Sequence, residues 1–188
     1  MEFKNIKKDG TIVDAEDIKY SPDELSNAFL KGLVNSDVTV LEFKRIETGK
    51  VFLKVVINEK EYVLKVLLRN ITNAGWKEKL DMKRIQVPNL ELDITEFLEF
   101  RVPVYHLIVG MYNFDDNPIF VAWDANRHLN KETIRSFYVN IDTLLEGYNK
   151  EYFTEDYASQ KIWVFKNNKF KEYITDYCSY YDKICGNF

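Results

Sequence analysis

Two polar stretches of the sequence, residues 69–86 and 124–136, hold side chains of the types that contact nucleic acid. Both are rich in the Arg, Lys, Asn, Gln, Ser and Thr residues that bond to phosphates and base edges. Segments of this length between regular elements are usually functional or disordered. The candidate contact residues are Arg69, Asn70, Thr72, Asn73, Trp76, Lys77, Lys79, Lys83, Arg84, Gln86, Asn126, Arg127, His128, Asn130, Lys131, Arg135 and Ser136.

The basic residues of the first stretch suit phosphate groups. Between residues 69 and 84, five Lys or Arg residues stand against Glu78 and Asp81, which leaves a net charge of +3. Lys77 and Lys79 lack the planar fork that bidentate base contacts need, so we expect them to bind phosphates. A solvated charged loop is the alternative interpretation.

Arginine and amide side chains suit base edges. Arg84 either reads guanine through its fork or ties the first stretch to the rest of the domain. Asn126 and Arg127 lie at the centre of the second stretch, and we expect them to read bases. The Asn residues of the first stretch equally suit turns. Trp76 either stacks on a base or sugar or, as we favour, covers the end of the folded core.

A looser pattern points to a different chemistry. Asp23 after Pro22, followed by Glu42-Phe43-Lys44, matches the spacing of nucleases in which two carboxylates hold Mg²⁺ and a lysine helps to activate water. Glu42 and Lys44 lie in a strand-like context, but Asp23 opens a helix where the nuclease pattern needs the end of a strand. We therefore expect a non-catalytic domain with no metal and no cofactor, and keep the Mg²⁺-dependent nuclease as the alternative.

The composition excludes several classes of protein. The 188 residues are 46 % hydrophobic and 30 % charged, which suits a single domain with a packed core. Cys178, Cys185 and the two histidines suit neither a disulfide framework nor a zinc site. We see no secretory signal and no membrane span, so we expect a cytoplasmic protein. The formal net charge is −4, but residues 142–156 alone contribute −4, so the basic stretch keeps a local positive field.

The elements that must position these residues are mostly strands. Ser21-Pro22-Asp23-Glu24 predicts the start of a helix of about 13 residues. A short helix is predicted at 142–148, and tyrosines at helical spacing predict another at 169–183. Alternating apolar residues predict strands at 39–48, 51–57, 62–68, 105–112, 119–123, 137–141 and 162–165.

Seven strands with few helices predict a mainly β fold, a seven-stranded antiparallel pseudobarrel with short flanking helices. Closure would remove the exposed strand edges. We expect an N-terminal arm and helix at 1–37 packed on the barrel, the barrel at 38–168, and a C-terminal helix at 169–188. The tyrosines of that last helix either dock on the barrel or lead to a following domain. A protein-interaction module with a Tyr-rich tail is a third interpretation.

Three short motifs give the two polar stretches a family resemblance. Asn70-Ile71-Thr72, Arg84-Ile85-Gln86 and the run from Val121 to His128 resemble elements of a DNA-binding domain in bacterial restriction systems. That domain is similar to the plant B-three domain and to the specificity domains of some type II restriction enzymes. The resemblance is strongest to the N-terminal domain of the GTPase subunit in LlaJI-type, McrBC-related systems, and it covers roughly residues 40–175.

The resemblance implies a function and a set of partners. Members of that family form a DNA-binding pseudobarrel from which two arms enter the major groove. We therefore expect a sequence-specific double-stranded DNA recognition module of a restriction system, with arms at 69–86 and 124–136. An AAA+ GTPase motor domain and a nuclease subunit are the implied partners, and host defence is the implied role.

Overall fold

We describe the fold from a computed structural model, in which residues 3–7, 9–47, 49–87, 103–112, 118–125, 135–157 and 160–185 are placed well enough to describe. The helices are α1 (Pro22–Asn35), α2 (Ile141–Lys150) and α3 (Phe170–Cys185). No helix in these ranges is both long and apolar enough to cross a membrane. The strands are β1 (Lys4–Ile6), β2 (Ile12–Asp14), β3 (Thr39–Glu47), β4 (Lys50–Ile57), β5 (Lys60–Asn70), β6 (Thr72–Asn73), β7 (Met82–Val87), β8 (Val104–Tyr112), β9 (Ile119–Trp123), β10 (Arg135–Asn140), β11 (Tyr152–Tyr157) and β12 (Gln160–Lys166).

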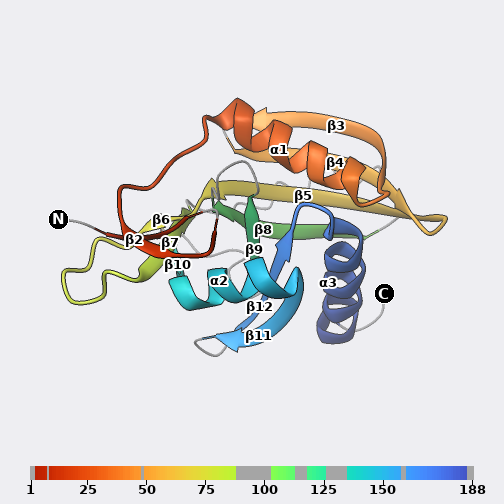
Figure 1. The fold of residues 1–188 in the computed structure, drawn as a ribbon. Coiled ribbons are helices and arrows are strands. Elements are labelled where there is room, and N and C mark those ends of the chain that lie inside the picture. The colour runs from red at the N-terminus through yellow and green to blue at the C-terminus, as the bar shows by residue number, and fades with distance from the viewer. Residues whose placement is uncertain are drawn as a thin grey trace.

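The main sheet has seven strands in the order β11-β12-β9-β8-β5-β4-β3 (Figure 1). All neighbouring pairs are antiparallel except β5 and β8, which run parallel. The prediction of a mainly β protein is confirmed, but the prediction of an antiparallel barrel is wrong, because the sheet is mixed and does not close. The chain leaves β5, forms β6 and β7, and returns to begin β8 from the same end. That crossover makes β8 parallel to β5.

A second, smaller sheet lies beside the first, in the order β10-β7-β6. It contains the strand predicted at 137–141, which therefore does not belong to the main sheet. The seventh place there is taken by β11, an acidic strand that the alternation pattern did not predict. A β1–β2 hairpin from the predicted N-terminal arm forms the third sheet.

The main sheet packs against other elements on both of its faces. Leu53, Leu64 and Leu107 point to one face, where they pack against α1 and α3 in one hydrophobic cluster. Ile108 and Val121 point to the other face, where α2, β7 and β10 cover them in a second cluster. Side chains alternate between faces along a strand, so β8 and β9 contribute to both clusters. The small sheet is thus fixed on the main sheet by apolar packing.

The helices begin and pack as their sequences predict. Ser21 caps α1: its hydroxyl accepts from the Glu24 backbone N–H, and the Glu24 carboxylate accepts from the Ser21 N–H. Tyr173 and Tyr177 of α3 are fully buried on the sheet, as one of the two predicted roles of the tyrosine stripe requires. Gly32 lets α3 approach α1, because a Cβ there would lie 2.2 Å from the Phe170 ring.

Candidate nucleic-acid interface

The small sheet turns one face inward and the other outward. On its inner face, Ile85, Val87, Phe137 and Val139 are buried against the main sheet. Residues of β7 that alternate with these, and the residues paired with them on β6 and β10, therefore point outward. The predicted first arm is the β6–β7 hairpin, which extends from one end of the molecule (Figure 1).

The outer face brings together five polar or aromatic side chains in two cross-strand rows. Thr72, Arg84 and Tyr138 form the first row across β6, β7 and β10. Gln86 and Ser136 form the second row. Gln86 is exposed and the other four are partly exposed. Four of these five residues were predicted contacts, and the structure places them next to one another although 64 residues separate Thr72 from Ser136.

Arg84 has no ion-pair or hydrogen-bond partner among the described residues. An arginine that stabilised the domain would use its planar fork on a carboxylate or a backbone carbonyl. The guanidinium makes no such contact within the described ranges, and alternation along β7 places the Arg84 side chain on the outer face beside Tyr138. Neither of the two predicted roles for Arg84 is thereby decided, and base reading stays a prediction; the described contacts show no tie from this side chain to the domain.

An aromatic pair borders the outer face. The ring of Trp76 stacks on that of Tyr138, with centroids 4.7 Å apart and an interplanar angle of 29°. The Lys79 ammonium lies 5.6 Å from the Trp76 ring centroid, a cation–π distance. Trp76 keeps 40 % of its surface exposed. The preferred prediction, that Trp76 covers the core, is therefore wrong, because its ring lies on the outer face of the small sheet.

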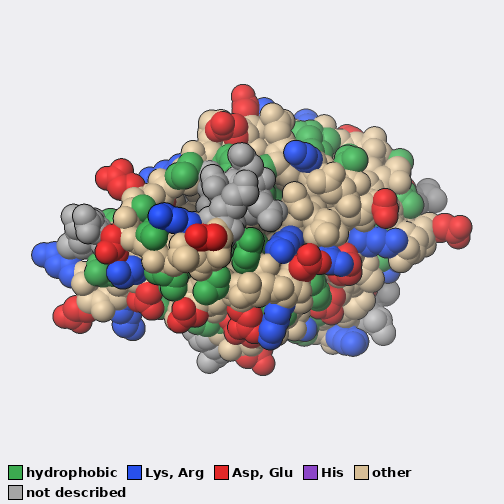
Figure 2. Space-filling view, in the orientation of Figure 1, with side chains coloured by type: hydrophobic (Ala, Val, Ile, Leu, Met, Phe, Trp, Pro, Cys, Tyr) green, Lys and Arg blue, Asp and Glu red, His purple; other side chains and the backbone are tan. Residues whose placement is uncertain are grey.

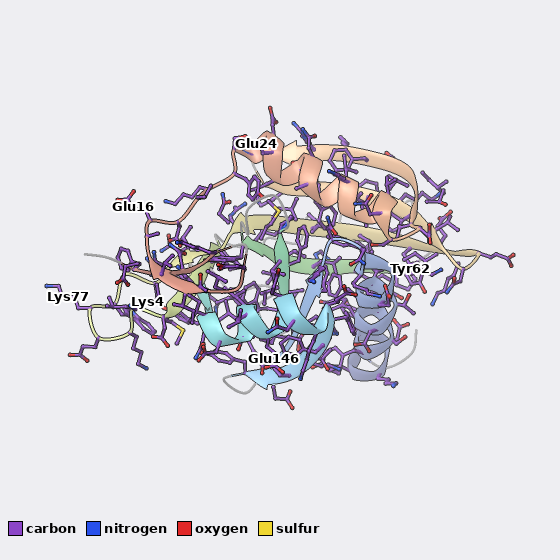
Figure 3. The ribbon with its side chains drawn as sticks, in the orientation of Figure 1. Lys4, Glu16, Glu24, Tyr62, Lys77 and Glu146 are labelled. Carbon is purple, nitrogen blue, oxygen red and sulfur yellow. The ribbon has the colours of Figure 1, made fainter. Side chains whose placement is uncertain are left out.

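The loop between β6 and β7 carries the exposed charges of the arm. Lys77 and Lys79 are exposed there, and Lys77 extends away from the body of the molecule (Figure 3). Acidic side chains are interspersed with basic ones at this end (Figure 2), and Glu78 is the exposed acid between the two lysines. Lys77 has no charged partner among the described residues, which leaves its ammonium available to an external anion.

Lys83 differs from its neighbour Arg84 in burial and in its hydrogen-bond partners. Its side chain is fully buried on the inner face of the small sheet. Its ammonium donates to Asp17 Oδ1 at 2.7 Å, to Asn73 Oδ1 at 2.7 Å and to Asn5 Oδ1 at 2.8 Å. All three ammonium protons thus have partners within the domain. The prediction that Lys83 contacts DNA is therefore wrong for the structure as it stands, since an outside phosphate cannot reach it.

The three partners of Lys83 make it a link between the N-terminal arm and the hairpin. Asn5 lies in β1, Asp17 follows β2, and Asn73 lies in β6. Asp17 Oδ2 also accepts from the Asn73 backbone N–H at 2.6 Å, and the Tyr112 hydroxyl donates to Asn5 at 2.7 Å. We call these five residues the Lys83 cluster. Burial lowers the pKa of the Lys83 ammonium, and the bond and charge of Asp17 act in the opposite direction.

Two more predicted contact residues serve the fold. The Asn70 side chain accepts from the Tyr20 N–H at 2.9 Å and donates to the Tyr20 carbonyl at 2.8 Å, which fixes the chain that enters α1. Asn70 and Asn73 thus use their amide side chains for contacts with other segments of the chain, and these contacts are not the turn role that was the alternative to reading bases. Arg69 lies at the end of β5, in the main sheet, and donates to the Leu68 carbonyl at 2.9 Å.

The second predicted arm lies mostly outside the described residues. Asn126, Arg127, His128, Asn130 and Lys131 fall there, so their contacts remain predictions. Arg135 and Ser136, the last two residues of that arm, open β10, and Ser136 belongs to the outer face. Arg135 pairs with the inward-pointing Val87 and is partly buried. Asp124, at the start of the stretch, is buried and accepts from the Tyr180 hydroxyl at 3.2 Å.

The residues of the nuclease-like pattern do not meet. Asp23 forms an ion pair with Arg45, which points to the α1 face of β3 next to Phe43. Glu42 and Lys44 alternate with these residues and point to the opposite face of the sheet. Within the described ranges, no three His, Cys, Asp or Glu residues lie close enough to hold a metal ion. Asp23 and Glu42 therefore do not form one metal site here.

Tyr138 and two of the partners of Lys83, Asn5 and Asp17, were not among the predicted residues. Tyr138 lies in a strand of alternating apolar residues. Only the pairing of β10 with β7 shows that Tyr138 is the cross-strand neighbour of Arg84 on the outer face. Asn5 and Asp17 lie in a polar arm that gave no sign of its partner. A lysine flanked by alternating apolar residues, as Lys83 is in Met82–Val87, was the one available signal of burial.

The described residues define a mainly β domain with a mixed sheet, a projecting hairpin and a polar, aromatic outer face. The chain belongs to the methylase-associated X1 family, whose model matches residues 62–174, more than half of the chain. The match runs from β5 into α3 and includes the whole small sheet. No curated protein and no solved structure matches the chain. The family's description associates it with methylases, and the LlaJI-type assignment stays a prediction.

Proposed function

We propose that the chain is the double-stranded DNA recognition module of a methylase-associated restriction system, and that it binds through the outer face of the small sheet. The observation that carries the proposal is the row of Thr72, Arg84 and Tyr138, at whose centre the guanidinium has no partner among the described residues. The major groove admits a two-stranded β-ribbon such as the β6–β7 hairpin, and side chains of these types meet base edges there. Family membership supports the association with a methylase.

The parts of the interface have different tasks in this proposal. Lys77 and Lys79 bind phosphates from the hairpin loop, and the outer face meets the bases. Recognition involves no chemistry and no cofactor, and DNA cleavage belongs to other domains or subunits. The resemblance to LlaJI-type systems makes a GTPase motor and a nuclease subunit the candidate partners.

The test is a titration of fluorescent random duplexes at two or more salt concentrations. We expect wild-type binding to weaken steeply as salt rises, because phosphate contacts release counterions. The Lys77→Ala, Lys79→Ala double variant should weaken binding to all duplexes and lower the salt slope by about two. Lys31→Ala, an exposed change on α1, is the control for loss of a positive charge outside the hairpin and should bind as wild type does. Absence of binding to any duplex, or binding that salt does not affect, contradicts the proposal.

A further inference from the structure

The two β7 side chains that reach the outer face differ in hydrogen-bonding chemistry. Arg84 offers a fork of donors, and Gln86 offers one donor group and one acceptor. The third outward position of β7, Met82, is partly buried and accepts a hydrogen bond from the Tyr157 hydroxyl at 3.5 Å. Ile85, between Arg84 and Gln86, is buried on the inner face. Base contacts from β7 are therefore limited to Arg84 and Gln86.

Each of these two side chains matches one base. An arginine fork bonds to O6 and N7 of guanine, and a glutamine amide bonds to N6 and N7 of adenine. The described structure leaves both side chains free to do so, since neither makes a hydrogen bond or an ion pair within the described ranges. Thr72 and Tyr138 flank Arg84, whereas Ser136 is the paired neighbour of Gln86. The two positions therefore have different cross-strand neighbours.

The strand geometry limits how far apart the two bases lie. Residues two apart on an antiparallel strand are separated by about 7 Å. Stacked base pairs are separated by about 3.4 Å along the helix axis. Two residues of β7 therefore span at most about two base-pair steps, and fewer when the strand follows the groove obliquely. The hairpin loop with Lys77 and Lys79 lies beyond the Met82 end of β7, so phosphate contacts are on the Arg84 side.

We infer that Arg84 and Gln86 are specificity-determining residues, and that they select a guanine and an adenine no more than two base-pair steps apart. This inference rests on the proposed function, because it requires that the outer face enters the major groove. It adds the identity of two bases, their spacing, and the residue that reads each one.

The experiment is a binding-site selection from a random duplex pool by the full chain and four variants. Wild type should select a motif that contains both bases. Arg84→Ala should lose the guanine preference by at least fivefold and keep the adenine, and Gln86→Ala should do the reverse. Arg84→Lys keeps the charge and loses the fork, so it should retain the salt slope but not the guanine. Lys31→Ala is the control and should select the wild-type motif.

Each contrary outcome has a separate meaning. The inference is overturned if both alanine variants keep the wild-type motif, if both relax the same position, or if the relaxed positions lie more than two steps apart. Duplex binding by wild type without base preference also overturns it but leaves the proposed function standing. If wild type binds no duplex, both fail. Thermal unfolding of each variant checks that these changes at the surface leave the fold intact.

Discussion

Neighbouring residues of one strand have opposite roles here. Lys83 and Arg84 are consecutive, and both were among the predicted DNA contacts. Their positions on opposite faces of β7 separate them: one is buried with three partners, and the other faces outward with none among the described residues. A local motif could place candidate contact residues on β7. It could not predict which of them point outward, because that depends on how β7 pairs with β10.

The Lys83 cluster should be essential for stability. Lys83→Met leaves the Asp17 carboxylate buried without its cation, and loss of one member of a buried pair costs about 3–5 kcal/mol. We expect urea unfolding to show a loss of that size. Lys83→Met combined with Asp17→Asn removes both charges and should recover part of the loss. A single variant as stable as wild type would contradict the assigned role.

His106 should make the domain sensitive to mild acid. Burial, with a smaller contribution from Lys65, lowers the pKa of His106 from 6.5 to about 4. Between these two values the unfolded chain binds a proton that the folded domain does not, so stability falls as the pH drops from 6.5 towards 4. The loss attributable to His106 is roughly 2–3 kcal/mol.

His106→Gln removes this titration and is the variant to compare. Unfolding free energies of both proteins at several pH values between 4 and 7 separate the histidine from the carboxylates, which are common to both. We expect the difference between wild type and variant to change with pH over this range. A difference that stays constant would show that His106 is not protected from protonation in the fold.

Among the elements, the sequence predicted where helices and strands occur better than it predicted which strands pair with one another. Every predicted strand has a counterpart in the structure, and so does every predicted helix. The strand at 137–141 was predicted in the wrong sheet, and the parallel pairing of β5 with β8 was missed. Alternation reports that a strand has a buried face but not which neighbour covers it. Those errors come from the long connections, whose return paths no local pattern records.

The edge strand β3 shows how an open sheet avoids pairing with other chains. The predicted barrel would have closed this edge. Instead, Glu42, Lys44 and Arg45 place charges along β3, and its register with β4 shifts between Val40 and Glu42 and again between Arg45 and Glu47. Charges and bulges are the usual protection of an exposed edge. The exposed Leu41 lies within the first irregularity.

Gly110 of β8 sets the distance between the two sheets. A Cβ at this position would lie 2.6 Å from Ile71 Cγ1 and 2.9 Å from Ile85 Cγ2. Gly110→Ala should therefore destabilise the domain by about 1–3 kcal/mol through overpacking. Thermal unfolding measures the loss, and Ile71→Val in the same chain should relieve part of it. If Gly110→Ala unfolds at the wild-type temperature, the sheets are less tightly packed than described.

At the scale of the whole molecule, charge is distributed unevenly. The chain is acidic overall, yet the cationic residues of the hairpin loop and Arg84 lie at one end, and the acidic residues of α2 and β11 follow the small sheet in sequence. The net charge taken alone therefore argues against DNA binding. The distribution of the charges, however, allows one face to attract a polyanion. The family match over residues 62–174 includes that face but not Asn5 or Asp17, which precede it.

The central claim is that DNA binds to the outer face of the small sheet, and a hydrogen-exchange footprint tests it most directly. The full chain is compared with and without a duplex selected from a random pool. We expect slower exchange in the hairpin loop at residues 74–81 and in the flanking β7 and β10, with little change in α1 and β3. Protection of α1 or β3, with unchanged exchange across the hairpin and β10, would show that DNA does not bind to the outer face.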